Sequence, residues 1–179
     1  DVKTFPVPFD LTEVKKNINF ITKTRSKLYE EELINEAIKL QSEGNLLEAE
    51  KCYQYILEKG FEDSKVYSNY GIILKDLGKL QDAEISQRKA IELKPNFAEA
   101  HSNLGIILKD LGKLKESELS YRKAIEIKPD YAKAHLNLGN ILRDFGKLQE
   151  AEVSTRKAIQ MNPNFTEAHS NLGTILKDL

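Results

Sequence analysis

A period of 34 residues constrains the fold of this chain more than any other feature of its sequence. Residues 98–131 have a near-copy before them and another after them, and the same residue types return at the same place in each copy. The recurring positions include the glycines Gly71, Gly105, Gly139 and Gly173, and the prolines Pro95, Pro129 and Pro163. A fixed period of this length is typical of a protein that stacks one structural unit many times.

Each copy is predicted to begin with an amphipathic helix. In the central copy the packing stripe consists of His101, Leu104, Gly105 and Leu108, whose spacing of three and four residues is that of one helix face. Gly112 follows this stripe, and glycine readily takes the left-handed conformation that ends a helix. The first helix of each copy is therefore expected to stop just before this glycine.

A second helix is predicted between Gly112 and Pro129, because proline cannot continue a helix. Its stripe consists of Leu114, Ser117, Tyr121, Ala124, Ile125 and Ile127. The small residues Gly105 and Ala124 are expected to let the helices approach closely. Two antiparallel helices joined by a short turn cannot bury both stripes alone, so neighbouring copies must supply the rest of the core.

The repeat frame places four full copies and one half copy along the chain. Their bounds are 30–63, 64–97, 98–131, 132–165 and 166–179. Residues 1–29 are predicted to form a leader and a capping helix. Two prolines favour an extended run over residues 1–9, whereas an apolar stripe predicts a helix over 11–24. We expect that helix to cover the open end of the stack, with a linker helix as the alternative.

Composition argues against several classes of protein. The chain has 27 Lys and Arg against 28 Asp and Glu, so its charge gives no reason to expect nucleic acid or an anionic membrane as partner. Cys52 is the only cysteine, which excludes a disulfide within the chain. No apolar run is long enough for a transmembrane helix, and we expect a cytoplasmic protein. Because the sequence begins with Asp1 and stops at Leu179 inside a repeat, we interpret it as a piece of a longer protein.

The repeat resembles the tetratricopeptide repeat, a helix–turn–helix motif of 34 residues. The matching residues of the central copy are Leu104, Gly105, Ala124 and Pro129. It departs from the family pattern at His101, where a large aromatic residue is usual, and at Ser117, where alanine is usual. The copy at 30–63 departs most, with Ala37 in the glycine position. The resemblance covers about residues 30–179 and implies an all-α, right-handed superhelical solenoid of about 4.5 repeats.

One position of the first helix is asparagine in every copy. These residues are Asn35, Asn69, Asn103, Asn137 and Asn171. Asparagine is a middling helix former, so helix propensity does not require it, and its amide can both donate and accept hydrogen bonds. The row resembles the asparagine ladder in the repeats of the O-linked N-acetylglucosamine transferase, which implies that it holds the backbone of a peptide on the concave face. Two alternatives stay open: an inert residue copied by duplication, or a hydrogen bond between neighbouring repeats.

Other polar residues are expected on or near this face. They are Asn140 and the recurring cations Lys75, Lys109, Arg143 and Lys177. Such cations can hold a peptide carboxylate, but each also adjoins an aspartate in what can be an exposed ion pair of ~0–1 kcal/mol. The family's carboxylate clamp for chaperone tails is not implied, because Ile72 stands where the clamp has asparagine.

No motif predicts catalysis, a metal or a cofactor. His101, His135 and His169 occur once per repeat at a packing position, without a Cys or carboxylate cluster at chelating spacing, which favours a structural role. The sequence has no phosphate-binding glycine loop, metalloprotease helix motif or nucleophile elbow. The recurring arginines Arg88, Arg122 and Arg156 are expected to face solvent on the convex side.

The half repeat 166–179 is a first helix without a second helix after it. Its apolar residues are Leu172, Ile175, Leu176 and Leu179, and we expect them to form an uncovered face. Exposed apolar patches favour association, so we expect this piece of chain to self-associate through its last helix.

These features together predict a non-catalytic scaffold that binds a protein, as a peptide or a partner helix, in its concave groove. A second hypothesis is a substrate-recruiting arm of a larger glycosyl- or sulfotransferase. A third is a spacer whose repeats only set a distance. The partner's identity does not follow, because fold does not imply function.

Overall fold

A computed structural model describes residues 29–179, and the leader 1–9 and the helix expected over 11–24 lie outside them. The chain divides into two compact bodies, Asp1–Phe61 and Glu62–Leu179, which we call the N-terminal and the C-terminal body. The described part of the N-terminal body has a helix over 29–42 and α2 (Leu46–Glu58). Ala37 on the first of these helices and Tyr53 on the second are both fully buried.

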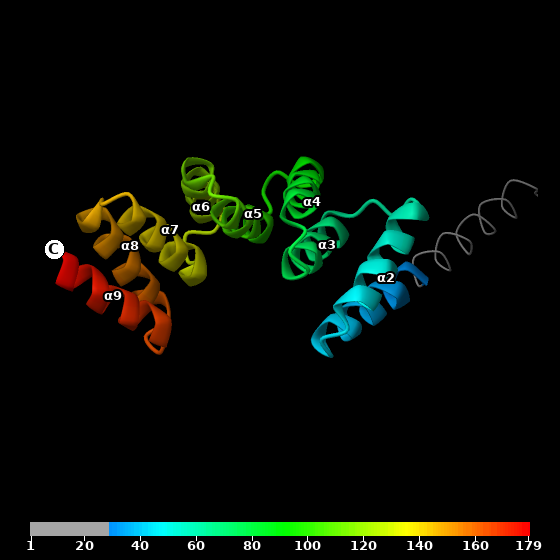
Figure 1. Cartoon of the computed structure of the whole chain (residues 1–179), viewed down its shortest axis with the longest axis horizontal. Helices are drawn as coiled ribbons and strands as arrows, with labels where there is room; N and C mark the ends of the chain where they lie inside the picture. Colours follow the sequence, from blue (N-terminus) through cyan, green and yellow to red (C-terminus); the bar gives the residue numbers. More distant parts are fainter. Residues whose placement is uncertain (1–28) are drawn as a thin grey trace, which may run out of the picture. The chain divides into compact units, whose positions relative to one another are not determined.

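The C-terminal body is a succession of helix pairs (Figure 1). Its helices are α3 (Ser64–Asp76), α4 (Leu80–Leu93), α5 (Ala98–Asp110), α6 (Leu114–Ile127), α7 (Ala132–Asp144), α8 (Leu148–Met161) and α9 (Thr166–Asp178). We call α3, α5, α7 and α9 the A helices and α4, α6 and α8 the B helices. The described residues contain no strand, which confirms the all-α fold of paired helices.

The turn inside each pair is built on a glycine with left-handed backbone. Gly112 has φ of 74° and follows α5 by two residues. There the N–H of Gly112 donates to the carbonyl of Lys109 at 2.9 Å, and the N–H of Lys113 donates to that of Leu108 at 2.8 Å. These bonds satisfy carbonyls that a helix end leaves open, and they confirm the predicted helix stop.

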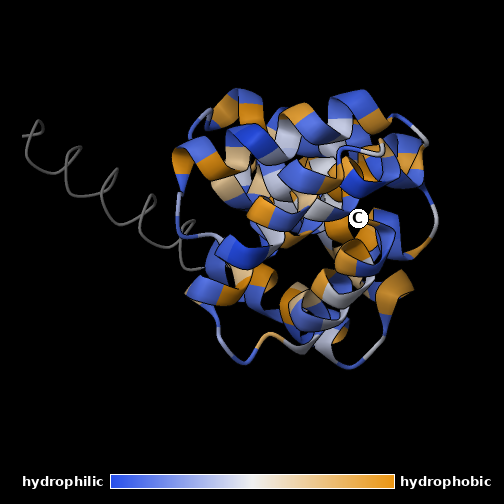
Figure 2. Ribbon diagram, turned by 90° about the vertical axis from the view of Figure 1, so that its left-hand side faces the viewer, coloured by the Kyte–Doolittle hydropathy of each residue, from blue (hydrophilic) through white to orange (hydrophobic). Residues whose placement is uncertain are grey.

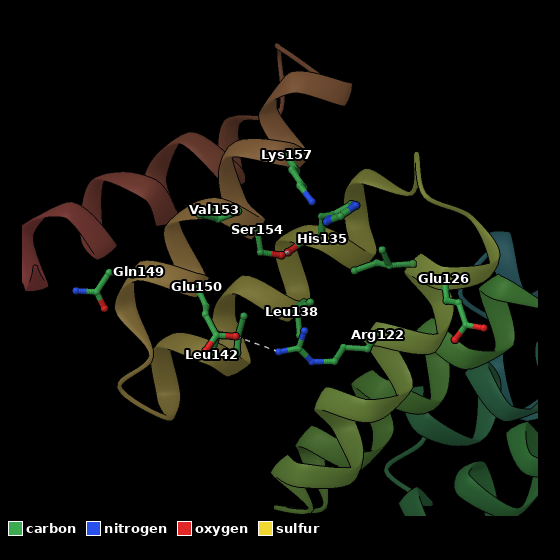
Figure 3. A pocket seen from close by; sticks show the side chains of 11 residues that line it. Arg122, Glu126, His135, Leu138, Leu142, Gln149, Glu150, Val153, Ser154 and Lys157 are labelled. Carbon is green, nitrogen blue, oxygen red and sulfur yellow. Dashed lines mark hydrogen bonds and ion pairs between the residues drawn. The ribbon is translucent and has the colours of Figure 1, made fainter.

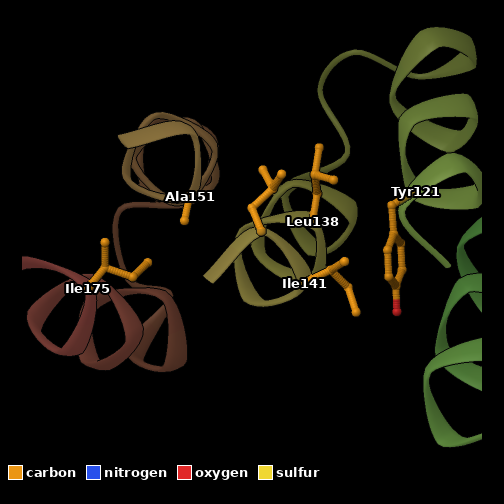
Figure 4. Packing of buried hydrophobic residues seen from close by; sticks show 6 residues of the cluster. Tyr121, Leu138, Ile141, Ala151 and Ile175 are labelled. Carbon is orange, nitrogen blue, oxygen red and sulfur yellow. The ribbon is translucent and has the colours of Figure 1, made fainter. Parts of the chain in front are cut away.

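Successive pairs share one core. Each B helix packs against its own A helix and against the A helix of the following pair. Each helix therefore needs an apolar face as well as a polar one. Figure 2 shows hydrophobic and hydrophilic segments alternating along the helices. One cluster joins Tyr121 of α6 to Leu138 and Ile141 of α7 and to Ile175 of α9 (Figure 4). The core therefore runs through the stack, as expected for units that cannot bury their stripes alone.

In the pairs α3–α4, α5–α6 and α7–α8, a glycine of the A helix lies directly against the B helix. A Cβ added to Gly105 would lie 2.7 Å from Cε1 of Tyr121, and one added to Gly71 would lie 2.7 Å from Nε2 of Gln87. The same addition at Gly139 would collide with Oγ1 of Thr155. The expected small-residue contact is therefore present, and its partner is one recurring position of the B helix.

The last helix is partly covered. Ile175 is fully buried, so its placement in an uncovered apolar face was wrong; Ala151 of α8 lies in the same core cluster. Leu176 and Leu179 are 47% and 51% exposed, and a Cβ on Gly173 would meet nothing within 4 Å. Self-association through α9 stays a prediction.

Candidate functional site

The recurring asparagines of the C-terminal body lie at the same position of successive A helices and are half-buried. They are Asn69, Asn103, Asn137 and Asn171, which we call the asparagine ladder. Asn35, in the N-terminal body, is exposed. A half-buried amide at a fixed place on each helix can present hydrogen-bonding groups at regular intervals.

Asn103 belongs to a polar network that joins two repeats. Its Nδ2 donates to Oγ of Ser68 on α3 at 3.3 Å. The Ser68 hydroxyl in turn donates to Oε1 of Gln87 at 3.1 Å, and Nε2 of Gln87 donates to the Ser68 carbonyl at 2.7 Å. Gln87 is completely buried, so these bonds satisfy a side-chain amide that would otherwise destabilise the core.

The ladder alternates between bonded and unbonded amides. Asn171 donates from Nδ2 to Oδ1 of Asn140 at 2.8 Å, again between two A helices. Within the described residues, Asn69 and Asn137 make no such side-chain hydrogen bond. The alternative of a bridge between repeats therefore accounts for Asn103 and Asn171, and leaves the amides of Asn69 and Asn137 free.

Two of the predicted cations form ion pairs within residues 29–179, and two do not. Lys75 forms an ion pair with Asp76 at 2.7 Å, and Arg143 approaches Asp144 at 3.8 Å. Lys109 and Lys177 are exposed and have no ion pair in the part of the chain that the structure describes. Partly exposed pairs of this kind contribute little to stability, so all four cations can turn toward a bound carboxylate.

The three histidines have the structural role expected from the sequence, through a hydrogen bond that sequence reasoning missed. The ring Nε2 of His101, His135 and His169 lies 2.9, 3.0 and 2.8 Å from the carbonyl oxygen of Pro95, Pro129 and Pro163. A carbonyl only accepts, so the ring nitrogen is the donor. Each bond ties an A helix to the end of the preceding repeat. The signal was available, because histidine follows proline by six residues in three copies.

His135 is expected to make stability depend on pH. Burial lowers the pKa of its imidazole below the ordinary value. The unfolded chain then binds the proton more readily, so the stability given by the neutral ring is complete above about pH 6.5 and is lost as pH falls toward the folded-state pKa. The free energy of unfolding, measured with urea near pH 7.5 and near pH 5.5, should change less between the two pH values for His135→Gln than for the unaltered chain. An equal difference in both proteins would contradict this role.

A hollow recurs beside each B helix of the C-terminal body. The three hollows measure ≈ 430, 430 and 540 Å³ along the chain, and we number them first to third in that order. Each is lined by one aliphatic residue, one serine and one lysine from equivalent positions. These sets are Ile85, Ser86 and Lys89; Leu119, Ser120 and Lys123; and Val153, Ser154 and Lys157. The aliphatic members are 67%, 67% and 58% exposed.

Ion pairs between repeats run along the same side. Arg88 bonds Glu84 within α4 at 2.8 Å and Glu116 of the next repeat at 2.9 Å, and Arg122 repeats the pattern toward Glu150 at 3.2 Å. Hydrogen bonds from Lys113 and Arg88 hold the pKa of the Glu84 carboxyl below its ordinary value. The recurring arginines are exposed, as expected; Arg88 and Arg122 also connect neighbouring B helices, whereas Arg156 pairs with Glu152 within α8.

Neither a metal site nor a membrane segment is found in residues 29–179. No three His, Cys, Asp or Glu side chains come together there in a way that could hold an ion. None of the helices described is both long and apolar enough to cross a bilayer.

Comparison with protein families agrees with the helix pairs. Tetratricopeptide-repeat models match residues 64–97, 87–118 and 132–165, and a further TPR-repeat model matches 107–144. The chain contains tetratricopeptide repeats. The family resemblance is thus confirmed over 64–165, whereas the likeness of its asparagine ladder to that of the transferase stays a prediction. The comparison with curated proteins gives no match.

Solved tetratricopeptide-repeat structures share the fold. MamA from Desulfovibrio magneticus RS-1 is 22% identical, with a TM-score of 0.73 over 82% of each chain. YrrB, described as having an unusual peptide-binding site, is 24% identical, with a TM-score of 0.69 over 80% of this chain and 71% of its own. The first repeat domain of Spaghetti (RPAP3), solved with an HSP90 peptide, is 23% identical, with a TM-score of 0.63 over 64% of this chain and 91% of its own.

Proposed function

We propose that the C-terminal body binds an extended peptide of a partner protein along the asparagine ladder, in the concave groove of the repeats. The observation that carries the proposal is the free amide of Asn69 and of Asn137, each half-buried on its A helix. A primary amide has two N–H donors and a carbonyl acceptor, which is the set that a peptide backbone complements. Two such amides can hold a peptide without reading its side chains.

The bonded members of the ladder support this division of roles. Asn103 and Asn171 each bond a neighbouring A helix, at 3.3 and 2.8 Å, and so hold adjacent repeats in register. The free amides therefore alternate with amides that fix the scaffold around them. Such preorganisation lowers the cost of ordering the site when a peptide binds.

Cations near the end of the A helices add a second contact. Lys109 is exposed and unpaired within residues 29–179, and Lys75 and Arg143 have only weak surface partners. A peptide carboxylate would gain a charge-assisted bond there, which is stronger than a neutral one. Peptide binding by YrrB and by the RPAP3 domain supports this use of the fold.

The test is a peptide-array screen on the unaltered chain, followed by affinity measurements on each binding peptide. The double variant Asn69→Ala/Asn137→Ala should bind about tenfold or more weakly, since each lost hydrogen bond contributes about 0.5–1.5 kcal/mol. The melting temperature should stay nearly unchanged, because neither amide has a partner within the described fold.

The matched control is Asn103→Ala, which removes an amide that is already bonded. It should lower the melting temperature, because it leaves the Ser68 network incomplete, and should weaken peptide binding less than the double variant does. Full binding by the double variant would move the site to another face. No binding by the unaltered chain would favour the spacer. An arm that recruits substrate for a larger transferase would use the same ladder, so the double variant tests its binding step too.

A further inference from the structure

The third hollow differs from the other two in its charge. In the first hollow Lys89 pairs with Glu92 at 2.9 Å, and in the second Lys123 pairs with Glu126 at 2.7 Å. Both pairs join residues three apart on a B helix. At the third hollow the residue three beyond Lys157 is Gln160, and Lys157 has no ion pair in the described part of the chain.

The other charged groups around the third hollow are already neutralised. Arg122 bonds Glu150 across the hollow at 3.2 Å, as Figure 3 shows, and Glu126 is held by Lys123. The His135 ring, beside Lys157 in the same view, donates to the Pro129 carbonyl. The Lys157 ammonium is therefore the one uncompensated charge among the residues lining this hollow, within the fold described.

The walls of the third hollow are aliphatic. Leu138 and Leu142 of α7 are buried, and Ile125 of α6 is half-buried. Val153 of α8 lines the same space and leaves 58% of its surface open to solvent. Burying such surface favours an aliphatic side chain, and ≈ 540 Å³ lies within the range of pockets that enclose a ligand.

We propose that the third hollow docks a segment of a partner protein that presents an aliphatic side chain next to a carboxylate. The aliphatic group lies against Val153, Leu138 and Leu142, and the Asp or Glu carboxylate accepts from the Lys157 ammonium. Lys157 needs no broken ion pair for this contact, unlike Lys89 and Lys123. The hollow belongs to α6, α7 and α8, and its B-helix wall is separate from the ladder, so the proposal does not depend on peptide binding there.

The probe is an array of acetylated, amidated nonapeptides, each printed once with a central Leu–Glu pair and once with Leu–Gln. Fluorescently labelled protein should bind a subset of the glutamate peptides about tenfold better than their glutamine twins, the size of one charge-assisted contact. The preferred peptides should shift the methyl resonances of Val153 in a carbon-labelled sample.

Three substitutions test the charge: two at exposed residues and one at the half-buried Lys89. Lys157→Gln should remove the preference for glutamate, and Gln160→Glu should reduce it by giving Lys157 the partner that Lys89 and Lys123 have. Lys89→Gln makes the same change at the first hollow and should leave the preference intact. All three variants should keep the far-ultraviolet circular dichroism and melting temperature of the unaltered chain within small limits, because surface changes rarely exceed about 0.5 kcal/mol.

Several results would overturn the proposal. Equal binding of the glutamate and glutamine peptides would show that the carboxylate is not recognised. An unchanged preference for glutamate in Lys157→Gln would show that Lys157 is not the residue that recognises it. Binding that is lost in Asn69→Ala/Asn137→Ala but kept in Lys157→Gln belongs to the asparagine ladder. That result would support the proposed function and contradict this inference. The reverse result would support the third hollow alone.

Discussion

Replacing Tyr121 with alanine is expected to lower the free energy of unfolding of the C-terminal body by about 3–5 kcal/mol. Tyr121 is 1% exposed, and it packs in one cluster with Leu138 and Ile141 of the next repeat. Figure 4 shows its ring beside Ile141 of α7. Removing the ring leaves a cavity between helices that the turns on either side hold in place, so little of it can close.

The same substitution should also change how the body unfolds. In a stack of repeats, cooperativity depends on the contacts between neighbours. Because Tyr121 belongs to the core cluster that joins α6 to α7, its loss should let Ala132–Asp178 open before Ser64–Ile127. Hydrogen exchange should show the amides of α7, α8 and α9 losing protection first, and urea unfolding should become broader.

The control for Tyr121 lies on the same helix. Leu119 is 67% exposed, and Leu119→Ala should change stability by no more than about 0.5 kcal/mol. A single sharp transition for Tyr121→Ala, with a loss below about 1 kcal/mol, would show that this ring does not couple the repeats.

Local signals in the sequence predicted the helices and their ends well. The left-handed Gly112 stops α5, and Pro129 follows α6 by two residues, as their conformational limits require. Both effects act within a few residues of the chain. Helix ends set in this way can be predicted without knowing what packs against the helix. The ends found in one copy are therefore expected at the same positions in the next.

Contacts between repeats were harder to predict. The position that faces each helix-pair glycine is Gln87, Tyr121 or Thr155, so residue type alone does not mark it as one site. The bond from His135 to the Pro129 carbonyl crosses the boundary of the repeat frame, and a frame drawn repeat by repeat separates its two partners. A residue that bonds to the neighbouring repeat is recognised only when the sequences on both sides of the repeat boundary are considered together.

The candidate sites show the same limit. The asparagine ladder was visible as a recurring residue, but the sequence could not say that Asn103 is bonded to Ser68 while Asn137 is free. The third hollow was missed altogether. It is formed by three helices together, and its special charge comes from Gln160, a residue that departs from the repeat rather than one that follows it.

Gly105→Ala and Gly173→Ala are expected to change stability in opposite directions, although both residues occupy the same position of the repeat. Alanine is the better helix former in a helix interior by about 0.5–1 kcal/mol. At Gly173 the added methyl group meets open space, so this gain should appear undiminished. At Gly105 the methyl group would lie 2.7 Å from the Tyr121 ring, and overpacking of about 1–3 kcal/mol should exceed the gain.

The net expectation for Gly105→Ala is a loss of up to about 2.5 kcal/mol in the free energy of unfolding, against a gain of about 0.5–1 kcal/mol for Gly173→Ala. Urea unfolding of both variants beside the unaltered chain measures the difference. A stabilised Gly105→Ala would mean that α5 and α6 can separate freely, and the small-residue contact would then not hold this pair together.

A double-mutant cycle identifies the source of the Gly105 penalty. In a Tyr121→Ala background the ring that meets the new methyl group is gone, so Gly105→Ala should no longer destabilise and should approach the behaviour of Gly173→Ala. The coupling energy between the two positions should then match the overpacking term of about 1–3 kcal/mol. Additive effects would instead place the strain in the α5 backbone or at the neighbouring Ser117, whose hydroxyl donates to the Gly105 carbonyl at 2.7 Å.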